Sequence, residues 1–152
     1  MQNIKRIVLL MIGFVPLLLF GFFINHLLMT AFWYAPGPYF LISIAVIVVW
    51  FIFGMISILL VSPKKEALLL LNASAFLVLL LIFFQELVLG HMWLNQIGLA
   101  TQMFYLPLVN FGSVFGGILP FHSFGIISTI SFIFLLCASY FGRITAERLR
   151  KF

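Results

Sequence analysis

Three histidines and one glutamate are the side chains of this sequence that could do chemistry at the edge of a membrane. They are His26, His91, His122 and Glu86. Neutral imidazole and carboxylate groups are ligands for Zn, Cu or Fe, so these four residues are the candidates for a metal site. Their spacing gives such a site no support, because Glu86 and His91 are five positions apart and no H-E-x-x-H pattern occurs. We therefore predict no metal and no other cofactor.

Glu86 also has the chemistry of a proton-handling group. A carboxyl group with an imidazole partner at an interface can be tuned toward neutral pH, which would suit a proton-coupled carrier or an enzyme acting on lipid headgroups. Glu86 and His91 are accordingly the candidate catalytic residues. The nearby Ser113 and Ser123 stand in no recognisable nucleophile elbow or triad order. The sequence thus favours a protein that is not an enzyme.

The segments that must position these residues are strongly apolar. Apolar residues make up 65% of the chain and charged residues 7%, which excludes a water-soluble fold. We predict a single all-α domain over residues 1–152, with four transmembrane helices at residues 7–28, 40–61, 67–89 and 121–142. The second and third helices must be antiparallel neighbours, because the Ser-Pro-Lys-Lys-Glu linker between them is short.

The basic residues set the expected orientation. All eight fall in three places beside the predicted spans, and the positive-inside rule assigns these places and both termini to the cytoplasm. Counted from Ile7 and Ala67, His26 and Glu86 each lie 19 positions along their helices, at a common height of about 28 Å. The layout favours a bacterial cytoplasmic membrane.

The same basic residues indicate partners. Dispersed over three membrane-flanking places, they argue against a nucleic-acid surface and for anionic lipid headgroups. The residues expected to meet headgroups are Lys5, Arg6, Lys64, Lys65, Arg143, Arg148, Arg150 and Lys151.

The region between the third and fourth spans is uncharged but mixed in polarity. Its apolar piece between Pro107 and Pro120 would measure about 18 Å as a helix, too short for a hydrocarbon core of roughly 30 Å. Counting it as a span would also carry the C-terminal basic cluster to the outside. We predict an outer re-entrant or interfacial segment over residues 103–120. Within it, Gly112 and Gly116 could break the backbone or allow close helix approach, and the sequence favours the former.

Two predicted helices carry faces suited to contact with protein. Asn72 and Glu86 fall on one stripe of the third span, and an unpartnered charge facing lipid is costly. In the fourth span, small residues recur at helical spacing and mark an internal face. Arg143 and Glu147, four positions apart, predict that this helix continues past residue 142. The expected interaction residues are Asn72, Glu86, Gly112, Gly116, Ser128 and Ser131.

These features favour an accessory, regulatory or stabilising subunit that binds another integral membrane protein. The argument rests on the absence of a soluble domain, a nucleotide motif or a catalytic pattern, together with an apolar outer loop suited to docking. Two alternatives stay open. One is a homo-oligomeric channel or a proton-coupled transporter that uses Glu86, and the other is a membrane enzyme acting on lipid headgroups at the outer face. A second copy of the chain is the alternative partner.

Overall fold

The protein is all-helical where its structure is described. A computed structural model describes residues 2–30, 39–116 and 123–151. The long helices are α1 (Gln2–Thr30), α2 (Tyr39–Leu60), α3 (Lys64–Phe83) and α6 (Phe124–Leu149), and the π-helical turn η1 (Phe84–Val88) extends α3. The four long helices are each long and apolar enough to cross a membrane. The chain is therefore a small polytopic membrane protein with four candidate spans.

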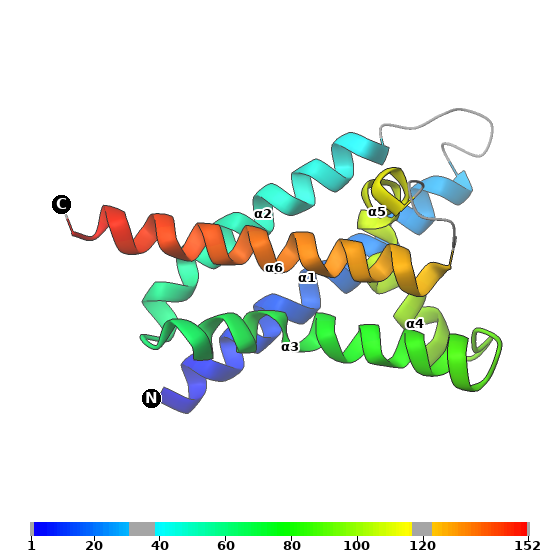
Figure 1. Ribbon diagram of the computed structural model, residues 1–152, viewed down its shortest axis with the longest axis horizontal. Coiled ribbons are helices and arrows are strands. Elements are labelled where there is room, and N and C mark those ends of the chain that lie inside the picture. The colour runs from blue at the N-terminus through cyan, green and yellow to red at the C-terminus, as the bar shows by residue number, and fades with distance from the viewer. Residues whose placement is uncertain (1, 31–38, 117–122, 152) are drawn as a thin grey trace.

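The four helices form an elongated bundle with two unlike ends (Figure 1). The first turns of α1, the α2–α3 turn and the last turns of α6 lie together at the left of the view. We call this the basic end, because all eight basic residues lie at or near it. At the other end, two shorter helices, α4 (Gln96–Tyr105) and α5 (Val109–Gly116), join α3 to α6 through the 3-10 turn η2 (Leu106–Leu108).

The four long helices correspond to the four predicted spans, but α1 and α3 begin earlier than predicted and α6 ends later. Residues 121–122 of the predicted fourth span lie outside the described residues. α6 continues to Leu149, and Arg143 pairs with Glu147 across one turn with an Nε–Oε1 distance of 2.9 Å, so the predicted continuation is confirmed. α6 packs most extensively against α2. Gly142 permits this close approach, because a Cβ atom there would collide with the carbonyl oxygen of Phe51.

The short segment between α3 and α6 is a helical hairpin that enters the bundle. The Tyr105 hydroxyl donates to the carbonyl of Ala75 at 2.7 Å, and Ser43 donates to the carbonyl of Pro107 at 2.7 Å. Ala75 lies about 17 Å along α3 from Lys64, so the hairpin reaches the middle of the bundle. A short helical segment is present between the third and fourth long helices, but it begins earlier than predicted, at Gln96, and contains two helices. Residues 117–120 of the predicted segment lie outside the described residues, and its re-entrant or interfacial position in a membrane stays a prediction.

α3 presents its predicted stripe to α6. Asn72 bonds to Ser139, the rings of Phe76 and Phe132 are 5.9 Å apart, and Glu86 meets Gly125. A second stripe of α3 faces α1 and the hairpin, and its members are Leu71, Ala75, Val78, Ile82 and Gln85. The strongest polar residues of this helix are therefore turned toward protein.

Candidate functional site

A buried polar cluster joins three helices near the middle of the bundle. The Trp50 indole of α2 donates to Asn72 Oδ1 at 3.0 Å, and Asn72 Nδ2 donates to the Ser139 hydroxyl of α6 at 3.0 Å. Trp50, Asn72 and Ser139 are all at most 3% exposed. One hydrogen bond joins α2 to α3 and the other joins α3 to α6, so the cluster holds these three helices together.

The hydroxyl groups in the spans bond mainly to backbone carbonyls. Ser57 donates to Gly54, Ser74 to Gly13 of α1, and Ser131 to Ile127 and to Leu108 of the hairpin. Ser128 differs, because its hydroxyl is buried with no hydrogen-bond partner in the described part of the chain. Within the described residues these groups form separate contacts, some inside one helix and some between helices, and do not form a continuous polar path.

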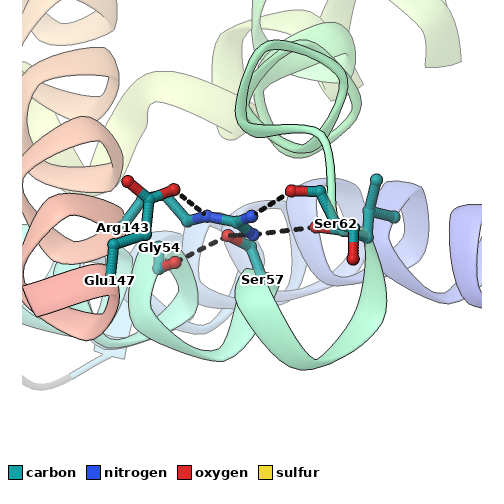
Figure 2. Close-up of polar contacts among 6 residues, drawn as sticks. Gly54, Ser57, Ser62, Arg143 and Glu147 are labelled. Atoms are coloured by element: carbon teal, nitrogen blue, oxygen red, sulfur yellow. Dashed lines mark hydrogen bonds and ion pairs between the residues drawn. The ribbon is translucent and has the colours of Figure 1, made fainter. Parts of the chain in front are cut away.

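Arg143 forms a clamp between α6 and the end of α2 (Figure 2). Its Nη1 donates to the carbonyl of Val61 at 2.9 Å and to the Ser57 hydroxyl at 3.3 Å, and its Nη2 donates to the carbonyl of Ser62 at 2.6 Å. Nε bonds to Glu147, which balances the charge. The clamp satisfies carbonyls that the end of α2 leaves without intrahelical donors.

Arg143 therefore differs from the headgroup-binding residue expected from the sequence. It is only 1% exposed, and all three guanidinium nitrogens donate to groups within the chain. The reason is its register, since Arg143 lies four positions after the buried Ser139 and so shares the internal face of α6.

The other basic residues lie at the surface of the basic end. Arg6 pairs with Glu66, and Lys64 places its Nζ 4.2 Å from the centroid of the Tyr140 ring. Lys5 is partly exposed and lines a recess with Ser62. The remaining basic residues are exposed: Lys65, Arg148, Arg150 and Lys151. Their predicted contact with lipid headgroups stays a prediction.

At the opposite end, Glu86 binds the start of α6. Its Oε2 accepts a hydrogen bond from the Gly125 backbone N–H at 2.9 Å, while the Ser123 side chain caps the same helix by accepting from Ile126. The first N–H groups of a helix lack intrahelical acceptors and carry partial positive charge, so a carboxylate is stabilised there. The described contacts of Glu86 thus serve packing of α3 on α6.

The histidines do not gather around Glu86 in the described structure. His26 and His91 are exposed, and His91 Nδ1 lies 2.9 Å from the carbonyl of Leu89. His122 lies outside the described residues. No group of three histidine, cysteine or acidic side chains that could hold a metal occurs in residues 2–30, 39–116 and 123–151. A metal site that includes His122 stays a prediction.

Gln85 is the organising residue that sequence reasoning missed. It is fully buried, its Nε2 donates to the Thr101 hydroxyl at 3.1 Å, and its Oε1 accepts from the Trp93 backbone N–H at 2.9 Å. It thereby fixes the turn between α3 and α4. Its place on the second stripe of α3, three positions after the buried Ile82, is the signal that could have revealed it.

Gly112 serves helix contact. It lies inside α5, and a Cβ atom there would press on the Ile127 carbonyl and the Ser131 hydroxyl of α6. The expectation of a backbone break at Gly112 is wrong, because α5 runs through this position. Gly116 is the last residue of the same helix.

Two features of the surface have no partner among the residues that the structure describes. The first is the apolar tip, which we define as the exposed side chains around the α3–α4 turn: Leu87, Val88, Leu94 and Ile97. The second is the α3/α6 groove, an apolar recess of about 550 Å³ between Leu68, Ala73 and Leu77 of α3 and Phe132 and Leu136 of α6.

Comparison with known proteins adds no relative. No family model, no curated protein and no solved structure matches this chain.

Proposed function

We propose that this protein is an accessory subunit that binds another integral membrane protein through the apolar tip. The observation that carries the proposal is a rigid turn that exposes apolar side chains. Buried Gln85 holds the backbone of Trp93 and the Thr101 side chain, yet the neighbouring Leu94 is fully exposed. The chain orders this turn with internal hydrogen bonds and buries none of the Leu94 side chain by doing so.

The height of the tip supports a protein partner. Residues 64–88 form a continuous 25-residue helical segment, about 37 Å long, whereas the hydrocarbon core is roughly 30 Å thick. With Lys64 at the edge of the hydrocarbon core and the helix along the membrane normal, Leu87 lies about 34 Å from that edge, beyond the acyl chains of the opposite leaflet. Apolar side chains at that height are better covered by protein than by headgroups and water.

The interior of the bundle favours binding over transport or catalysis. A channel or carrier needs a water-filled opening at the end of the bundle. Here the hairpin fills that end with Phe104, Tyr105 and Leu108, which have no exposed surface. Glu86 is bonded to the start of α6, and the polar cluster at Asn72 is satisfied within the chain. These contacts supply scaffold rigidity, which suits a subunit that presents a docking surface.

Site-specific photocrosslinking in native membranes tests the proposal. A photoreactive residue at position 94 is expected to give one defined adduct with an unlike membrane protein. The same residue at Leu59, which is also well exposed but lies on α2 near the basic end, is expected not to give that adduct. Leu94→Asn should weaken retention of the captured protein about tenfold in gentle detergent, the effect of losing one apolar anchor. An adduct of two copies of this chain, or adducts with lipid alone, would overturn the proposal.

A further inference from the structure

The end of the α3/α6 groove that is nearest to the basic end lies one helical turn from a cation, Lys64. Leu68 on α3 and Leu136 on α6 line the groove. Lys64 precedes Leu68 by one helical turn and Tyr140 follows Leu136 by one turn, so both lie on the helix faces that form the groove. Lys64 Nζ is 4.2 Å from the Tyr140 ring centroid, which places the ammonium between the two helices.

The Lys64 ammonium has no carboxylate partner in the described structure. The sequence contains three acidic side chains. Glu66 pairs with Arg6, Glu147 pairs with Arg143, and Glu86 bonds to Gly125 at the other end of the bundle. Within the described residues, the Lys64 ammonium therefore has no carboxylate to neutralise it and is suited to bind an external anion.

The dimensions of the groove suit one leaflet of a membrane. From Leu68 to Leu77 the groove follows α3 for about 14 Å, close to half of a hydrocarbon core of roughly 30 Å. Beyond Leu77 the seam between the helices is closed, since Phe83 and Glu86 pack on Gly125. A transmembrane helix of a partner would need a contact that continues through both leaflets, whereas an acyl chain needs only one.

We propose that this groove binds an anionic glycerophospholipid, with one acyl chain between α3 and α6 and the phosphate at Lys64. The lining is almost wholly apolar, and Ala73 leaves room at its centre for the chain. Lys64 then supplies the preference for an anionic headgroup. This site lies nearer to the basic end than the apolar tip does, and it does not depend on the accessory function.

Lipid binding to the purified full chain tests the site. Native mass spectrometry should show one retained phosphatidylglycerol, bound in preference to phosphatidylcholine. Lys64→Gln should reduce that preference about fivefold, the effect of one basic group beside an anionic headgroup. Lys65→Gln is the matched control, because Lys65 is exposed, and it should preserve the preference. Equal preference in the wild type and in K64Q would overturn the proposal.

The acyl chain is tested separately from the headgroup. Ala73→Leu fills the groove and should reduce retention of both lipids, while Ala45→Leu fills a smaller apolar recess of about 220 Å³ between α1 and α2 and should not. In vesicles of phosphatidylcholine and phosphatidylglycerol, a phosphatidylglycerol with a photoreactive acyl chain should label residues 68–77 and 132–136. This labelling uses the unaltered chain, so it stays decisive if A73L fails to fold. Labelling spread evenly over all lipid-facing helices would overturn the proposal.

Discussion

Replacement of Arg143 by methionine should destabilise the basic end of the bundle, because it removes the contacts between α6 and the end of α2. The substitution keeps a long apolar stem but removes the donors to Ser57, Val61 and Ser62 and the ion pair with Glu147. The carbonyl of Ser62 belongs to an exposed residue and can turn to water, but Val61 is only 4% exposed. A buried carbonyl left without a donor costs about 1–3 kcal/mol, and loss of the charged hydrogen bonds adds to this.

We expect Arg143→Met to lower the free energy of unfolding by about 3 kcal/mol, near the lower end of values for breaking a buried ion pair. Arg143→Lys should lose about half as much, since one ammonium cannot reach all of these acceptors. The assay is reversible unfolding of the purified chain in mixed detergent micelles, followed by circular dichroism. Amide hydrogen exchange across residues 61–64 should rise in R143M, because the clamp holds that turn.

The matched control for the clamp is Arg148→Met, at an exposed position of the same helix. It should change the free energy of unfolding by about 0.5 kcal/mol or less, as is usual for a surface substitution. Equal free energies of unfolding for R143M and R148M would show that the clamp does not stabilise the bundle. An equal loss in Arg143→Lys and Arg143→Met would show that the geometry of the guanidinium group does not matter.

Three further substitutions test the packing, each by the same unfolding assay. Asn72→Leu removes the hydrogen bonds to α2 and α6 and should lower the free energy of unfolding by about 1–2 kcal/mol. Each hydrogen bond between membrane helices contributes roughly 0.6 kcal/mol, and the groups left unpaired add to the loss. An unchanged free energy of unfolding would show that the cluster does not stabilise the bundle. Gly142→Ala should cost about 1–3 kcal/mol by forcing α2 away, and an unchanged stability would refute that close approach. Glu86→Gln should cost about 0.3–1 kcal/mol, since it removes the charge at the start of α6 but can keep the hydrogen bond; a loss above about 2 kcal/mol would show a larger role for the carboxylate.

Several features of the fold could be predicted because they depend on local patterns. Four long apolar runs separated by turn or polar residues predict four helices, and the short segment around Pro107 was too short to be a fifth span. The pairing of Arg143 with Glu147 follows from helical spacing alone. The stripe from Asn72 to Glu86 could be assigned to protein contact because facing lipid is costly for both side chains.

Most contacts of the candidate site could not be predicted, because they join residues that lie far apart in the chain. Trp50 was indistinguishable from the aromatic residues that face lipid until α3 placed Asn72 beside it. Glu86 could have met a histidine, but the packing of α3 on α6 gives it the Gly125 N–H instead.

The sequence by itself determined that the chain is a membrane protein with four long apolar helices, and that the basic residues belong to one end. These properties follow from hydrophobic length and from helical periodicity, which are local quantities. Only the tertiary structure decided that Arg143 is buried in a clamp while Lys64 has no carboxylate partner among the described residues. The physical reason is that hydrogen bonds and ion pairs act over a few ångströms, so the partner of a charge depends on how helices distant in sequence are packed.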